Sequence, residues 1–254
     1  MTTVANIITV SRIFITIPAV WLLQQQSLYS LLLALILLNF LELTDAADGM
    51  IARARGEVTE IGKLLDPLFD SLCRFTVFAM LLQMGIMPLW MLLVLFYRDV
   101  CIAYYRSFAA QRNVTMAARF SGKAKAVIQG VGALLVTLVL FAEQMTLELS
   151  VGPDLSVTDN TLYGVMIGSW LFLVGFLVAF RLRGYIIWVI LAVGGGSSLV
   201  AIVLWESQFV MTSELAGSLN WWLCLTVALG TGWSLVDYTG RFFEIVRSTS
   251  EDTA

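Results

Sequence analysis

The sequence contains no histidine at all. This absence excludes histidine general bases, Ser-His-Asp triads and histidine zinc ligands. Its three cysteines are far apart and lie in apolar runs, which favours small buried hydrophobic residues over a disulfide or a metal site. Charged residues are scarce too, at 13% of the 254 residues. The few carboxylates are therefore the best candidates for a general base.

Hydrophobic residues, in contrast, make up 59% of the chain, and the mean hydropathy is +0.87. This composition predicts an all-α integral membrane protein with the lipid bilayer as its partner and no nucleic acid. The apolar runs predict a bundle of about eight transmembrane helices. Their expected ranges are 7–23, 28–55, 62–83, 88–110, 126–142, 162–180, 185–205 and 220–238.

The distribution of charge predicts how the bundle is oriented. Alternate connections contain neither lysine nor arginine, and they cover residues 24–27, 83–87, 143–160 and 207–219. All 15 lysines and arginines lie on the other side or on helix segments next to it. By the positive-inside rule, this predicts a multi-pass protein of the cell (inner) membrane with both termini in the cytoplasm.

Four aspartates lie at these cytoplasmic helix ends, within 26 residues: Asp45, Asp48, Asp66 and Asp70. Asp45 and Asp48 are spaced i,i+3, and Asp66 and Asp70 i,i+4, so each pair shares a helix face. Two facing helices would gather four like charges, which need a cation to neutralise them. Without histidine or paired cysteines, oxygen ligands favour Mg²⁺, Mn²⁺ or Ca²⁺. The alternative is that these carboxylates only pair with nearby arginines, as Asp70 could with Arg74.

Three residues next to these carboxylates suit an anionic ligand. Arg53 lies five residues past Asp48, near enough to serve an anion held by the metals. Gly49 and Gly62 favour a close approach of a ligand to the backbone, although packing glycines are also common in membrane helices.

Basic residues form a second group, on the cytoplasmic side of the fourth and fifth expected spans. They are Arg98, Arg106, Arg112, Arg119, Lys123 and Lys125. Beside metal-binding carboxylates, this group predicts a phosphate pocket, and Ser121-Gly122-Lys123 suits an anion-binding helix start. The alternative is contact with lipid headgroups, which suits Arg112, and a partly structural pairing of Arg98 with Asp99.

The stretch from Asp45 to Asp70 reads D-x2-D-G-x2-A-R-x8-G-x3-D-x3-D. It resembles the signature of the CDP-alcohol phosphatidyltransferase family. The resemblance implies a dimeric membrane bundle with a six-helix core, which displaces CMP from a CDP-linked lipid. It further implies that two divalent ions, Mg²⁺ or Mn²⁺, are held by Asp45, Asp48, Asp66 and Asp70. Asp66 and Asp70 are then the catalytic carboxylates, with Asp70 as the general base. The implied CDP-binding residues are Asp45, Asp48, Gly49, Ala52, Arg53 and Gly62.

Further motifs resemble the phosphatidylglycerophosphate synthases within this family. They include Gly62-Lys63-Leu-Leu-Asp66-Pro67, Gly122-Lys123-Ala-Lys125 and Ser234-Leu-Val-Asp237-Tyr238. This implies CDP-diacylglycerol as donor and glycerol 3-phosphate as acceptor. The residues implied for the acceptor phosphate are Arg106, Lys123 and Lys125, with Arg98 and Arg119. The sequence departs from that subfamily at Phe69 and Ser71, which flank Asp70, and at Ala126.

The resemblance also suggests a division of the chain. Residues 1–145 and 219–245 form the expected core, 146–218 an inserted helix pair with flanking loops, and 246–254 a cytoplasmic tail. Three other functions stay open at this stage. They are the same reaction with inositol phosphate, serine or a lipid as acceptor, an ion-coupled transporter, and a lipid-binding scaffold.

Overall fold

The computed structural model describes residues 4–55, 60–112, 114, 116, 120–151, 200, 203 and 210–251. Within these ranges the regular structure is entirely α-helical, as expected. The helices are α1 (Val4–Gln25), α2 (Leu28–Arg55), α3 (Glu60–Gln83), α4 (Leu89–Gln111), α5 (Phe120–Val151) and α9 (Ser213–Glu251).

These helices confirm the first five expected spans and the last one as helical segments. Three stretches are long and apolar enough to cross a membrane: Ile8–Gln25, Phe120–Glu148 and Ser213–Arg247. The apolar part of α2, Leu28–Thr44, is shorter. The expected span 162–180 lies outside the described residues, as does 185–205 apart from residues 200 and 203. The count of eight helices and the inserted pair therefore stay predictions.

Two expected connections prove to be partly helical. The acidic loop expected over residues 143–160 is wrong for its first part, because α5 continues to Val151. Its Glu, Gln, Met and Leu residues are all good helix formers, and polarity at a helix end does not stop a helix. Likewise α9 begins at Ser213, not 220. The Thr212 hydroxyl accepts a hydrogen bond from the backbone N–H of Leu215 at 3.3 Å, and Glu214 suits the first turn.

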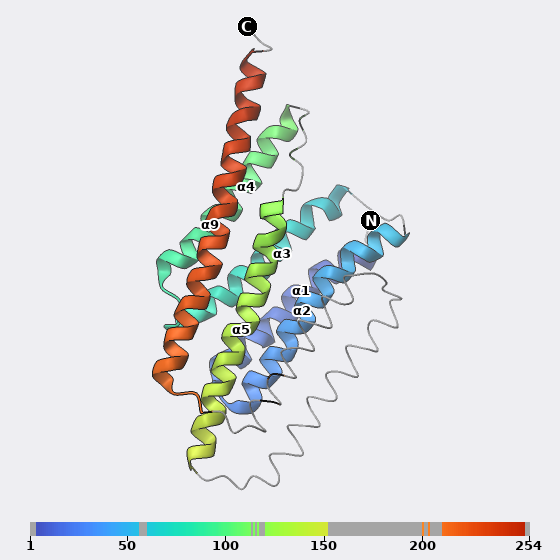
Figure 1. Ribbon diagram of the computed structural model, residues 1–254. Helices are drawn as coiled ribbons and strands as arrows, with labels where there is room; N and C mark the ends of the chain where they lie inside the picture. Colours follow the sequence, from blue (N-terminus) through green and yellow to red (C-terminus); the bar gives the residue numbers. More distant parts are fainter. Residues whose placement is uncertain are drawn as a thin grey trace.

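The helices form a bundle around a main apolar core, and Ala142, Met211 and Ala216 form a smaller separate cluster. α1 packs against α2 and α3, and α5 packs against both α2 and α9, while α4 packs against α9 (Figure 1). Leu35, Phe78, Met91, Phe141 and Val227 are among the fully buried core residues, and they come from five different helices. Burial of this kind is the main stabilising contribution to the bundle.

The outside of the bundle is also apolar. Phe14 is 69% exposed and Trp222 is 61% exposed, and many other large hydrophobic side chains are exposed along the helices. A soluble monomer does not expose apolar surface on this scale. Together with the apolar helices, this surface marks a membrane-embedded protein.

Glycines bring α5 and α9 close together. A methyl group on Gly132 would lie 2.3 Å from Cγ2 of Val227, and one on Gly230 would lie 2.8 Å from Cδ1 of Ile128. Small residues at such crossings let two helix backbones approach. The spacing of α5 and α9 therefore depends on having no side chain at these positions.

We expect Gly132→Ala to destabilise the protein by about 1–3 kcal/mol, because its new methyl group overlaps Val227. Thermal unfolding in detergent measures this as a lower Tm. Gly240→Ala is the matched control, since nothing lies within 4 Å of its added methyl group. Equal Tm values for the two variants would contradict this account of the α5–α9 contact.

Candidate functional site

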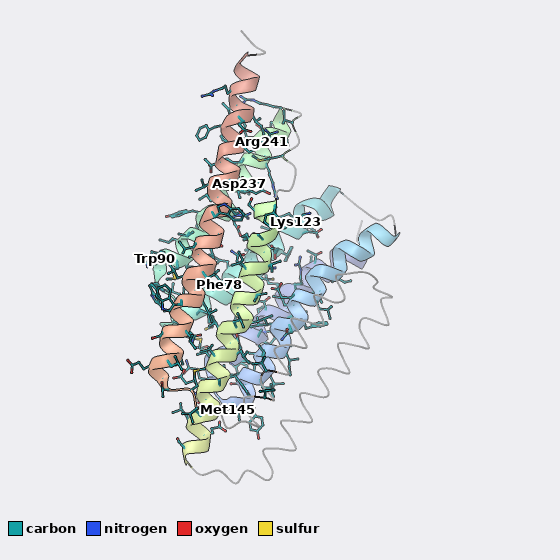
Figure 2. All side chains as sticks on the ribbon, in the orientation of Figure 1. Phe78, Trp90, Lys123, Met145, Asp237 and Arg241 are labelled. Atoms are coloured by element: carbon teal, nitrogen blue, oxygen red, sulfur yellow. The ribbon has the colours of Figure 1, made fainter. Side chains whose placement is uncertain are left out.

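The described arginines, lysines and aspartates gather toward one end of the bundle, whereas Glu143, Glu148 and Glu214 lie at the other. The last turns of α2, α4 and α9 and the first turns of α3 and α5 all point to this end (Figure 1). In Figure 2, Lys123, Asp237 and Arg241 lie toward it, whereas Met145 lies near the other end of α5. Residues that are far apart in sequence are thus brought together.

The residues expected on α2 all lie within that helix, which runs unbroken to Arg55. The i,i+3 spacing therefore places Asp45 and Asp48 on one helix face, as expected. The side chains of Asp45, Asp48 and Arg53, like the whole of Arg119, lie outside the described part of the structure. Their roles, and those of Gly49 and Ala52, stay predictions.

The second aspartate pair lies in the first half of α3. Asp66 accepts a hydrogen bond from the Thr9 hydroxyl of α1 at 2.9 Å, and Gly62 is buried one turn before it. Asp70 lies one turn further and accepts a 2.6 Å hydrogen bond from Nε of Arg74. Both contacts use Oδ1 of the carboxylate. The i,i+4 pairing of Asp70 with Arg74 is thus confirmed.

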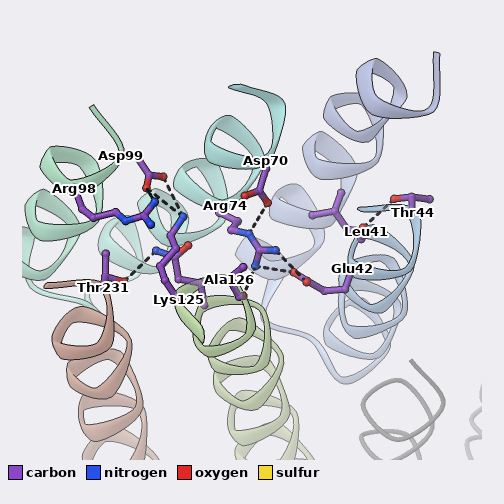
Figure 3. Close-up of polar contacts among 11 residues, drawn as sticks. Leu41, Glu42, Thr44, Asp70, Arg74, Arg98, Asp99, Lys125, Ala126 and Thr231 are labelled. Carbon is purple, nitrogen blue, oxygen red and sulfur yellow. Dashed lines mark hydrogen bonds and ion pairs between the residues drawn. The ribbon is translucent and has the colours of Figure 1, made fainter. Parts of the chain in front are cut away.

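Arg74 connects three helices at this point (Figure 3). Besides Asp70 on its own helix, it binds both carboxylate oxygens of Glu42 on α2, at 3.1 and 3.2 Å. It also donates to the backbone carbonyl of Ala126 on α5 at 3.0 Å. A bidentate contact of this kind is the strongest geometry for an arginine–carboxylate pair. Its guanidinium fixes where α2, α3 and α5 meet.

A neighbouring cluster joins α4, α5 and α9. Asp99 pairs with Arg98 at 2.8 Å, as expected, and also with Nζ of Lys125 at 3.1 Å. Arg98 donates a further hydrogen bond to the Ser234 hydroxyl of α9 at 2.9 Å. Arg98 and Lys125 are both buried, so Asp99 supplies the countercharge that their burial requires.

The end of α9 contributes an aromatic residue to the site. Tyr238 is fully buried, and the guanidinium groups of Arg98 and Arg106 each lie 5.7 Å from its ring centre. Nη2 of Arg106 also donates to its hydroxyl at 3.4 Å. Gly122 permits this position, since a methyl group there would lie 2.8 Å from the Tyr238 hydroxyl. Next to Tyr238, Asp237 accepts a hydrogen bond from the hydroxyl of Ser121.

These contacts divide the site into an acidic and a basic part. The acidic cluster is Glu42, Asp70 and Arg74, with two negative charges and one positive. The basic cluster is Arg98, Asp99 and Lys125, with two positive charges and one negative. They are adjacent because Lys125 of the basic cluster precedes Ala126, whose carbonyl binds Arg74. Counted over these named residues alone, the acidic cluster has a net charge of −1 and the basic cluster one of +1.

Sequence reasoning missed Glu42 altogether. It lies three residues before Asp45 in a helix, which is a same-face spacing and the available signal. The pairing of Lys125 with Asp99 was missed as well. Among side chains that the structure describes, no three potential metal ligands converge.

Comparison with known proteins identifies the family. A model described as CDP-alcohol phosphatidyltransferase matches residues 2–195, which is well over half of the chain. The chain therefore belongs to the CDP-alcohol phosphatidyltransferase family, which confirms the resemblance seen in the Asp45–Asp70 motif.

The chain is also similar to individual curated proteins of this family. A CDP-diacylglycerol–glycerol-3-phosphate 3-phosphatidyltransferase of Bacillus subtilis is 38% identical over 95 residues, covering 37% of this chain and 49% of the relative. One of Mycoplasma genitalium is 32% identical over 146 residues, covering 51% and 62%. A putative cardiolipin synthase of Mycobacterium bovis is 40% identical over 67 residues, covering 26% and 32%. The chain thus spans less than two thirds of the length of these relatives.

We expect Arg74→Gln to lower the free energy of unfolding by about 3 kcal/mol, because two partly buried carboxylates lose their countercharge. Arg241→Gln is a matched control. Arg241 contacts Glu244 at 2.6 Å too, but it is 54% exposed against 8% for Arg74, so its loss costs under about 1 kcal/mol. Thermal unfolding in detergent compares the two variants. A similar fall in Tm for both would show that Arg74 does not hold the three helices together.

Proposed function

We propose that this protein transfers a phosphatidyl group from CDP-diacylglycerol to sn-glycerol 3-phosphate and releases CMP. Family membership supports the class of reaction, and the names of the Bacillus and Mycoplasma relatives support this donor and acceptor. The observation that carries the proposal is the adjacency of an acidic and a basic cluster at one end of the bundle. Such a pair suits a reaction between a diphosphate and a second phosphorylated substrate.

In the proposed reaction, the acceptor hydroxyl oxygen attacks the phosphorus that bears the diacylglycerol. A new P–O bond forms there, the P–O bond to CMP breaks, and Asp70 takes the hydroxyl proton. Arg74 fixes the carboxylate of Asp70 through its Nε and keeps it oriented. Gly49, Ala52, Arg53 and Gly62 are proposed to line the CDP pocket.

The proposed metal ligands are Asp45, Asp48, Asp66 and Asp70. Asp66 and Asp70 fit this role, because they are one helical turn apart and offer only carboxylate oxygens, the donors that Mg²⁺ and Mn²⁺ prefer. Two bound ions would neutralise the diphosphate and the charge on the departing CMP. The Thr9 hydroxyl orients Asp66 by its hydrogen bond to Oδ1.

The basic residues differ in burial, and this difference suggests two roles for them in binding the acceptor phosphate. Lys123 is exposed and Arg106 is half-buried, so these two side chains can bind the phosphate directly. Arg98 and Lys125 share Asp99 and supply the net positive charge behind them. Arg119 stays a proposed contributor.

We also propose where the enzyme acts and in what oligomeric state. The site faces the cytoplasm of the cell membrane, where water-soluble glycerol 3-phosphate reaches it, and the acyl chains of the donor lie in the bilayer. The charge distribution along the sequence supports this orientation. Family resemblance supports a homodimer.

A lipid acceptor is the second candidate. It is favoured by the matching segment of the putative cardiolipin synthase. A lipid would then replace glycerol 3-phosphate as the acceptor in the same reaction. The basic cluster argues for the smaller, more highly charged acceptor.

A CMP-release assay with a panel of acceptors tests the proposal. We expect glycerol 3-phosphate to support release, and serine, inositol phosphate and phosphatidylglycerol to support little. Asp70→Asn should lower kcat by about 10²–10⁴-fold because the general base is lost. Glu244→Gln is the control, as it removes an exposed carboxylate from the same end. Full activity of a folded Asp70→Asn variant with any acceptor would refute the proposed base.

The phosphate-binding role of Lys123 makes a separate prediction. We expect Lys123→Gln to raise KM for glycerol 3-phosphate about tenfold, the loss of one charge-assisted contact, while KM for CDP-diacylglycerol stays unchanged. Arg241→Gln, which removes another exposed cation near the same end, should change neither constant. An equal effect of both variants on both substrates would instead indicate general attraction of anions to this surface.

A further inference from the structure

Asp70 lies among cations, although it is a proposed metal ligand. Nε of Arg74 donates a hydrogen bond to Oδ1 of Asp70 at 2.6 Å, and the positive charges of Lys125 and Arg12 also act on this carboxylate. A cation beside a carboxylate opposes the binding of a second cation there, because like charges repel. The proposed metal role of Asp70 therefore requires that these positive charges be offset by other groups nearby.

Glu42 offsets the charge of Arg74. Its two carboxylate oxygens accept hydrogen bonds from Nη1 and Nη2 of Arg74 at 3.1 and 3.2 Å (Figure 3). Asp70 occupies the Nε side of the same guanidinium. One positive charge is thus shared between two carboxylates, so the group of three residues stays negative and can still attract a divalent cation.

The fold keeps the Glu42 carboxylate in this place. Arg74 is buried, and Glu42 packs against α5, where a methyl group on Gly130 would lie 2.6 Å from the carboxyl carbon of Glu42. Solvent and salt therefore screen this pair less than they screen a surface ion pair. Lys125 is treated in the same way, since its Nζ pairs with Asp99 at 3.1 Å. Each of these two cations is thus offset by a carboxylate on another helix.

We propose that Glu42 is a positioning residue of the transfer site, which neutralises Arg74 so that Asp70 can be oriented by an arginine and still bind a divalent cation. This inference rests on the proposed function, because it takes Asp70 as a metal ligand. Glu42 acts through Arg74 and is not a metal ligand itself, since both of its oxygens bind the guanidinium. Arg74 supplies the orientation of Asp70, and Glu42 removes the repulsion that this arginine would otherwise exert on the metal.

Binding of Mn²⁺ to the purified full chain in detergent tests this inference. Mn²⁺ alone is the probe, and the electron paramagnetic resonance signal of the free ion gives Kd without substrate or turnover. We expect Glu42→Gln to weaken Kd by about 10–100-fold, the range typical for losing a partner that supports a metal ligand. Glu42→Asp keeps the negative charge and should bind Mn²⁺ nearly as well as the wild type. Glu244→Gln is the matched control, because it breaks an exposed Arg–Glu pair on α9 and should leave Kd unchanged.

A double variant separates the effect of charge from that of structure. In Glu42→Gln/Arg74→Gln the positive charge that Glu42 offsets is removed as well, and the net charge of the three residues returns to its wild-type value. We therefore expect Mn²⁺ to bind this variant more tightly than Glu42→Gln, with a Kd close to that of the wild type. A purely structural role predicts weaker binding instead, because both residues that join the helices are then lost. Thermal unfolding shows that the compared variants are folded.

The variant Asp70→Asn distinguishes failure of this inference from failure of the proposed function. If Asp70→Asn loses Mn²⁺ binding while Glu42→Gln keeps the wild-type Kd, Asp70 is a metal ligand and the role of Glu42 is refuted. A double variant that binds Mn²⁺ more weakly than Glu42→Gln also overturns the inference. If Asp70→Asn binds Mn²⁺ as tightly as the wild type, the proposed metal role of Asp70 is wrong, and the role of Glu42 is refuted with it.

Discussion

The contact of Arg74 with Asp70, Glu42 and the Ala126 carbonyl is the interaction on which the site depends. A buried guanidinium needs anions around it, and here they come from two helices, while a third helix offers a backbone acceptor. This requirement places α2, α3 and α5 in one register. The register in turn brings Lys125, next to Ala126, within reach of Asp99. The acidic and basic clusters are therefore adjacent as a consequence of one arginine.

Glycines on α5 make room for these polar contacts. A methyl group on Gly130 would lie 2.6 Å from the carboxyl carbon of Glu42, and one on Gly122 would lie 2.8 Å from the Tyr238 hydroxyl. If Gly130 carried a side chain, Glu42 could not lie against α5 and bind Arg74 at the same time. Helix packing and site chemistry thus use the same property, since close backbones and short polar contacts both require positions without a side chain.

Local sequence patterns predict much of this structure. They do not predict contacts between residues that are far apart in the sequence. Helical spacing predicted the Asp70–Arg74 pair, because the two residues are four apart on one helix. The partner of Arg74 on α2, Glu42, is 32 residues away, and no periodicity links the two. Lys125 and Asp99 are likewise 26 residues apart. The lower hydrophobicity of residues 143–151 predicts a loop, but their helix propensity is high and α5 continues through them. The spacing of Asp45 and Asp48 on a helix was predicted correctly.

The length and straight course of α5 have a mechanical consequence. Lys125 and Glu143 are eighteen residues apart on this helix, which is about five turns, so they share one face at a separation of about 27 Å. Turning α5 about its axis would move Lys125 relative to Asp99 and swing Glu143 through the same angle at the far end.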